Sequence, residues 1–179
     1  MKKVALLTAL FCAVAMIGSS AFAVSPLRSV GVEAGYVSPD LSGVENTSGT
    51  WVAGLFLDFG LPMTNMYINP FVNYWNWSDG SGSEQLNFSD WTAGANLKMT
   101  IPTAGPISPF IAAGASAHMM NMTQDSLNLD QSETKFGYQA GAGVKIGVSQ
   151  SANLITSGWY NHVENANNWS LRAGLAFSI

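Results

Sequence analysis

Residues 135–148 read Lys-Phe-Gly-Tyr-Gln-Ala-Gly-Ala-Gly-Val-Lys-Ile-Gly-Val, and their pattern decides the fold. Aromatic, aliphatic and alanine side chains occupy every second position, and glycine, glutamine and lysine stand between them. Successive side chains of a β-strand point to opposite faces. In an α-helix, by contrast, side chains return to the same face about every 3.6 residues. The segment is therefore predicted to be a strand with one apolar face and one face of small and polar residues.

The same alternation recurs along the chain. Four further segments show it clearly: residues 30–37, 51–61, 91–101 and 168–179. Three more segments have the length and position of strands but no clean alternation: residues 66–77, 107–120 and 153–163. The sequence thus predicts eight strands.

The predicted connections between these strands alternate in length. The longer ones are polar: residues 38–49, 78–89, 121–134 and 163–168. The shorter ones are tight turns: residues 62–65, 102–106 and 149–152. Long loops at one end and short turns at the other are typical of a transmembrane β-barrel. We therefore predict an all-β fold, an eight-stranded antiparallel up-and-down transmembrane β-barrel with short periplasmic turns and longer extracellular loops.

The composition decides which face of the strands points outward. Charged residues make up 10% of the chain, against roughly 25% in an ordinary soluble domain. The less apolar face consists mainly of glycine, serine, threonine and asparagine, which suits a narrow lumen better than a surface in water. The apolar face is then expected to meet lipid. A sequence pI near 4.9 leaves no basic surface for nucleic acid.

The N-terminal residues have the order of a secretory signal peptide. Lys2 and Lys3 precede an apolar run over residues 4–17, and small residues follow up to Ala23. We predict that residues 1–23 are a signal peptide cleaved after export through the Sec pathway, and that residues 24–179 form the barrel domain. The only cysteine, Cys12, would leave with the signal, so no disulfide is expected in the exported protein.

The six tryptophans are predicted to form a belt at one membrane interface, because the assumed strand directions place all of them near the long-loop end. They are Trp51, Trp75, Trp77, Trp91, Trp159 and Trp169.

The few charges on the small-residue face are predicted to meet inside the barrel. Counted from the ends of their strands, Glu33, Asp58, Lys98 and Lys145 are expected to form one layer, with Arg172 closer to the loops. Buried charges need partners, so these residues predict a structural network of salt bridges in a lumen filled by side chains. The alternative is a gate whose rearrangement opens a narrow channel.

The last strand, Asn168-Trp-Ser-Leu-Arg-Ala-Gly-Leu-Ala-Phe-Ser-Ile179, is similar to the C-terminal signal of outer-membrane barrels. The signal usually ends in an aromatic residue, whereas here Ile179 is last and Phe177 stands two positions before it. The whole mature chain resembles the eight-stranded OmpX-like and OmpA-barrel-like proteins of Gram-negative bacteria, the porin family of outer-membrane proteins. The resemblance implies location in the cell outer membrane, contact with its lipid and lipopolysaccharide, and assembly by the outer-membrane assembly machinery. We expect a monomer.

One motif raises the possibility of an enzyme. The segment His162-Val-Glu-Asn-Ala166 is similar to the His-x-Ser-Asn-Ala motif of the lipid A deacylase family, but Glu164 replaces the serine. Acyl transfer by that route needs the nucleophile, so we expect no catalytic residues, and no metal or cofactor site either. The expected function is a structural or surface-interaction role through the extracellular loops. A narrow channel and a lipid A-modifying hydrolase are the alternatives.

Overall fold

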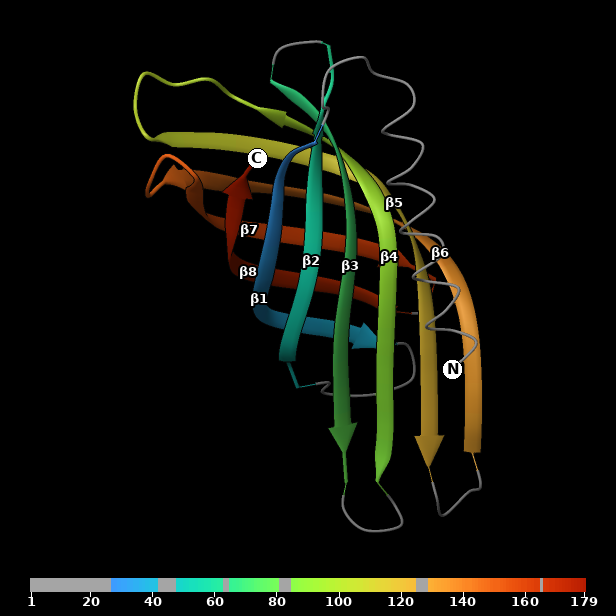
Figure 1. Cartoon of the computed structure of the whole chain (residues 1–179). Coiled ribbons are helices and arrows are strands. Elements are labelled where there is room, and N and C mark those ends of the chain that lie inside the picture. Colours follow the sequence, from blue (N-terminus) through green and yellow to red (C-terminus); the bar gives the residue numbers. More distant parts are fainter. Residues whose placement is uncertain (1–26, 42–47, 63–64, 81–84, 125–128, 165) are drawn as a thin grey trace.

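The computed structural model describes residues 27–41, 48–62, 65–80, 85–124, 129–164 and 166–179. Consecutive strands pair antiparallel and the last strand pairs with the first, so the sheet closes into a barrel. The strands are β1 (Leu27–Leu41), β2 (Thr50–Gly60), β3 (Met66–Asp79), β4 (Leu86–Thr100), β5 (Ile107–Gln124), β6 (Leu129–Gly147), β7 (Ala152–Val163) and β8 (Ala166–Ser178). Figure 1 shows them side by side in chain order. The predicted eight-stranded antiparallel barrel is confirmed.

The strands wind around the barrel with a large stagger. Starting at Pro109 on β5, one row of register partners passes through β6, β7, β8, β1, β2, β3 and β4 and returns to β5 at Met119, ten residues further along that strand. A closed sheet needs such a shear because its strands tilt against the barrel axis. Register partners on neighbouring strands therefore do not lie at equal heights.

The two ends of the barrel differ. At one end, here called the turn end, residues 61–65, 101–106 and 148–151 connect β2 to β3, β4 to β5 and β6 to β7. Asn65 adopts a positive φ of 72° in the first of these turns, and the Leu61 amide donates to the Met66 carbonyl across it at 2.9 Å. β1 begins and β8 ends at the same end. The opposite end is called the loop end.

The strands run further toward the loop end than the sequence predicts. Residues 121–134 were expected to be a loop, yet β5 continues to Gln124 and β6 begins at Leu129, with these two residues in register. The strand signal is absent there because both faces of this hairpin carry polar residues. Backbone pairing continues all the same, since it does not require an apolar face.

The strand faces that alternate clearly in the sequence point their apolar side chains outward, as predicted. Exposed large hydrophobic side chains lie on all eight strands, for example Val32, Leu55, Leu97 and Leu175. The inward positions hold glycines and polar residues together with a few large rings. Gly31 lies opposite Phe56 in the β1–β2 register, and a Cβ atom at Gly31 would overlap the Phe56 ring. A lumenal glycine thus makes room for a lumenal aromatic ring.

No helix among the described residues is long and apolar enough to cross a membrane. The predicted signal peptide, residues 1–23, lies outside the described residues.

Candidate functional site

The first charged pair lies in the lumen toward the turn end. Lys98 Nζ is 2.5 Å from Asp58 Oδ1, and both side chains are buried. Ser29 Oγ donates to Asp58 Oδ2 and Asn69 Nδ2 donates to Asp58 Oδ1, each at 2.9 Å. The ammonium group also lies 5.4–5.7 Å from three ring centroids, those of Phe56, Tyr67 and Phe110. The charges of Lys98 and Asp58 therefore neutralise each other within the barrel, and hydrogen bonds support the carboxylate. Buried charges need such partners.

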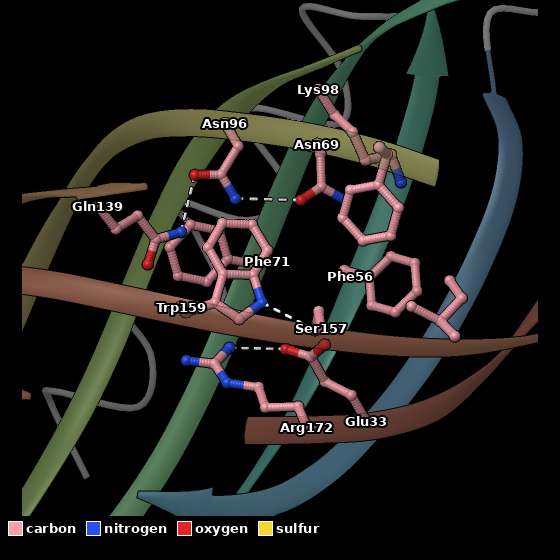
Figure 2. A pocket seen from close by; sticks show the side chains of 12 residues that line it. Glu33, Phe56, Asn69, Phe71, Asn96, Lys98, Gln139, Ser157, Trp159 and Arg172 are labelled. Carbon is pink, nitrogen blue, oxygen red and sulfur yellow. Dashed lines mark hydrogen bonds and ion pairs between the residues drawn. The ribbon is translucent and has the colours of Figure 1, made fainter. Parts of the chain in front are cut away.

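The second charged pair joins β8 to β1. Arg172 Nη1 donates to Glu33 Oε1 at 2.7 Å, and Arg172 Nε donates to Ser170 Oγ at 3.0 Å. The guanidinium carbon lies 5.8 Å from the centroid of the Trp159 ring. Both side chains of the pair are buried. Figure 2 shows this pair beside the ring of Trp159.

The two pairs replace the predicted single layer of charges. Glu33 was expected at the level of Asp58, yet the β1–β2 register sets Ser29 opposite Asp58 and Glu33 opposite Gly54. Glu33 instead meets Arg172, which was expected at a different height. The strand boundary explains the error, because β1 begins at Leu27 and not at residue 30, so Glu33 lies further from the turn end than Asp58 does. Lys145 is half-buried, and within the described chain it makes no ion pair.

A third buried group was missed by the sequence reasoning. His118 Nδ1 lies 2.7 Å from Asp90 Oδ2, and His118 Nε2 lies 2.9 Å from Ser116 Oγ. The same carboxylate oxygen accepts from Thr92 Oγ1 at 3.0 Å and from Trp75 Nε1 at 3.2 Å. The signal that could have found it is parity: Asp90 shares the inward face of β4 with Thr92, and Thr92 is the register partner of His118.

The order carboxylate, imidazole, hydroxyl also occurs in hydrolases, but here it is enclosed. The exposed fractions of Asp90 and His118 are 0% and 1%, and Ser116 is buried as well. The cavity beside His118 measures about 10 Å³. One water molecule needs about that volume, so the geometry offers no room for an acyl substrate. Hydrolysis would also need a path to the serine hydroxyl.

Among the described residues, two clusters of buried apolar side chains also lie in the lumen. The group at the loop end consists of Val37, Val52, Trp75, Trp77, Phe88, Met120, Val163 and Ala166. The second group lies nearer the turn end and consists of Phe56, Phe71, Phe110, Ala112, Ile155, Trp159 and Ala176. The cavity between the Lys98 and Arg172 side chains measures about 20 Å³ and is crossed by hydrogen bonds from Gln139 to Asn96 and from Asn96 to Asn69 (Figure 2). A space of this size has room for about one water molecule.

The predicted tryptophan belt is wrong for three of its six members. Trp75, Trp77 and Trp159 have exposed fractions of 3%, 4% and 6% and point into the lumen. The segments that carry them, residues 66–77 and 153–163, are two of the three whose alternation was not clear. The face to which Trp75 points follows from the strand register. Its register partner is Val52, which is buried in the lumen, and register partners point to the same face.

The remaining tryptophans do lie on the outer surface. Trp51, Trp91 and Trp169 are exposed, and tyrosines complete the rows between them. Tyr74 lies between Trp51 and Trp91 with ring centroids 5.7 and 4.7 Å away, and Tyr160 lies 4.5 Å from Trp169. The outer belt is thus built from alternating tryptophan and tyrosine, a composition typical of a membrane interface.

His162 lies on the outer surface of β7, where its ring stacks on Tyr138 at 4.7 Å. The two serines closest to it in sequence are Ser157 and Ser170, and both point inward. Ser157 accepts from Trp159 Nε1 at 2.9 Å, and Ser170 accepts from Arg172. The structure therefore does not bring either hydroxyl to His162. Among the described residues, no group of three or more histidine, cysteine, aspartate or glutamate side chains could hold a metal ion.

The sequence matches the family described as outer membrane protein beta-barrel domain over residues 9–177. The chain belongs to this family. Membership places it in the outer membrane of Gram-negative bacteria, as the resemblance implied. Among curated proteins, no significant match is found.

Solved structures with similar folds are also outer-membrane barrels. Neisserial surface protein A is 17% identical to this chain, with a TM-score of 0.68. The superposition covers 84% of this chain and 96% of that protein's chain. Ail, the attachment invasion locus protein of Yersinia pestis, has 12% identity and a TM-score of 0.53, covering 85% and 99%. The outer membrane enzyme PagL has 18% identity and a TM-score of 0.51, covering 84% and 99%. At these identities the similarity concerns the fold.

Proposed function

We propose that the protein is a non-catalytic outer-membrane component that acts in structural support or surface interaction through the hairpins at its loop end. The observation that supports the proposal is the set of described side chains in the lumen, which includes two ion pairs, a buried carboxylate–imidazole pair and two apolar clusters. Function would then reside on the part of the barrel that lies outside the membrane. Loops on a rigid scaffold are a common place for binding.

The length of β5 and β6 supports this proposal. These strands span 18 and 19 residues, whereas a transmembrane β-strand needs about 9–11. The pairing of β6 with β7 starts only at Gly137, so residues 129–136 continue beyond the edge of β7. The hairpin thus extends past its neighbour at the loop end and would be available to a partner there.

The proposed partners follow from the location. The outward apolar face would contact outer-membrane lipid, and the loop end would face lipopolysaccharide. The last strand, β8, would be recognised by the outer-membrane assembly machinery after export through the Sec pathway. The barrel is proposed to act as a monomer.

Trimming the β5–β6 hairpin tests the proposed surface role. Residues 121–132 would be replaced by a two-residue turn, which leaves the paired segments nearest the membrane in place. Bacteria that display the wild-type barrel should adhere to an epithelial-cell monolayer above the level of non-expressing cells, and the trimmed variant should return adhesion to that level. Unheated gel mobility would verify that the trimmed barrel folds. Equal adhesion of the two folded proteins would contradict a role of this hairpin.

A narrow channel is the second candidate, favoured by the two lumenal ion pairs. Opening would require Glu33–Arg172 or Asp58–Lys98 to separate and find new partners in the lumen. A steady ionic current that changes in Lys98→Met or Arg172→Met would favour it.

The enzyme alternative draws on the shared fold with PagL. Its direct test is the mass of lipid A from cells that overexpress the protein. An altered acyl pattern that disappears in His162→Ala would overturn the non-catalytic proposal, and an unaltered pattern supports it.

A further inference from the structure

The outer surface of the barrel is hollowed by a groove of about 700 Å³ that crosses β8, β1, β2 and β3. Three alanines in register form its floor, Ala173 on β8, Ala34 on β1 and Ala53 on β2. The next row toward the turn end carries larger side chains, which form one wall: Leu175, Val32, Leu55 and Val72. Small residues on three adjacent strands beside larger ones are the cause of the depression.

The groove has a direction relative to the membrane. Its floor belongs to the row of register partners that starts at Pro109, close to the turn end of β5, and reaches Met119 close to the loop end of the same strand. Within this row Ala173 comes before Ala34 and Ala53, and Tyr74 and Trp91 follow. The groove therefore rises from Ala173 toward the loop end.

The upper end of the groove lies within the outer aromatic belt. Tyr74 stands between Trp51 and Trp91, and the three rings close the groove at that end. Rings of this kind lie at the level of the lipid head groups. Glu33 borders the floor, but its carboxylate points into the lumen and pairs with Arg172. The outward side chains of the groove are thus apolar along its length below the rings.

We propose that this groove binds one acyl chain of a lipid from the leaflet at the loop end, with the lipid head group above Trp51, Tyr74 and Trp91. An acyl chain runs from the interface into the bilayer, which is the course of the groove from its rings down to Ala173. A second copy of the barrel fits this surface less well. In a two-fold interface the same patch meets itself, which would set hollow against hollow.

Photo-crosslinking in a bilayer tests the proposal. The folded full-length barrel would be placed in nanodiscs of phosphatidylcholine carrying a diazirine in its acyl chain, irradiated, and mapped by mass spectrometry of its peptides. Labels should concentrate on the peptides that carry Ala34, Ala53 and Ala173. Ala53→Leu adds three carbon atoms to the floor, and the loss of chain contacts should lower this labelling about fivefold. Ala142→Leu is the matched control, because Ala142 is an exposed alanine on the outer face of β6. It should leave the labelling unchanged.

Three outcomes would overturn the proposal. Labels spread evenly around the barrel would mean contact with bulk lipid only. Labelling of the groove that persists in Ala53→Leu would mean that the hollow does not hold the chain. Barrel-to-barrel crosslinks that vanish in Ala53→Leu would assign the surface to a second copy. Unheated gel mobility confirms folding of each variant, and Ala173→Leu at the lower end of the groove replaces Ala53→Leu if the latter does not fold.

Discussion

At the scale of single residues, two ion pairs join charged side chains across the lumen. Arg172 and Glu33 are held at 2.7 Å, and Lys98 and Asp58 form a second pair with its own hydrogen bonds. In a buried ion pair the attraction offsets the loss of hydration of both charges. Removing one partner is therefore far more harmful than removing both.

Arg172→Met should lower the free energy of unfolding by about 3–5 kcal/mol, because it leaves Glu33 buried without its partner. The double variant Arg172→Met with Glu33→Gln should lose less than the single variant. Urea unfolding of the refolded barrel in lipid vesicles measures both. Lys145→Met is the control, since Lys145 is half-buried and makes no ion pair within the described chain. If Arg172→Met were as stable as the wild type, the Glu33–Arg172 pair would not contribute to the stability of the barrel.

The sequence could predict which residues line the lumen more readily than which of them meet. Parity alone assigned Glu33, Asp58, Lys98 and Arg172 to the inward face. Their pairing depends on where each strand begins and ends, and β1 starts at Leu27, three residues before the predicted strand. The Asp90–His118 contact was missed because Asp90 lies outside the predicted strand 91–101, whereas β4 begins at Leu86.

At the scale of elements, neighbouring strands fit through pairs of small and large inward residues. Gly31 and Phe56 are register partners on β1 and β2, and the Phe56 ring occupies the space that a side chain at Gly31 would need. Gly141 relates to the ring of Trp159 in the same manner on β6 and β7. These glycines are thus part of the packing, although they weaken strands elsewhere.

Gly31→Ala should destabilise the barrel by about 1–3 kcal/mol, because the new methyl group overlaps the Phe56 ring. Phe56→Ala should lower the free energy of unfolding less in the Gly31→Ala variant than in the wild type. The reason is that the effects of substitutions at contacting residues are not additive. Gly105→Ala is the matched control, because nothing lies within 4 Å of its added Cβ atom. Urea unfolding provides the free energies. Equal losses at Gly31 and Gly105 would contradict the packing role.

How clearly apolar and polar residues alternate in each strand depends on what the two faces of that strand contact. Residues 135–148 alternate cleanly because glycine and lysine face a crowded lumen while large residues face lipid. On β3 and β7 both faces hold rings, with Trp75 and Trp159 inside and Tyr74 and Tyr160 on the other face. Hydrophobicity cannot assign the direction there, so three tryptophans were predicted on the wrong face.

At the scale of the whole molecule, the closed sheet leaves no unpaired strand edge within the membrane, and its apolar outer surface suits lipid. Closure is what allows a β-sheet to stay in hydrocarbon, where unpaired backbone groups are costly. The protein should therefore fractionate with the outer membrane and migrate differently on a gel before and after boiling. A soluble periplasmic protein whose mobility does not change on boiling would contradict this architecture.

Whether side chains fill the lumen can be measured as ion flux through the barrel. The refolded barrel would be inserted in potassium-loaded vesicles, with insertion verified by gel mobility. Eight strands enclose an interior that side chains can fill, and the two described lumenal cavities measure about 20 and 10 Å³. We predict potassium release no faster than from protein-free vesicles. Release that rises in proportion to the amount of folded barrel would contradict the account.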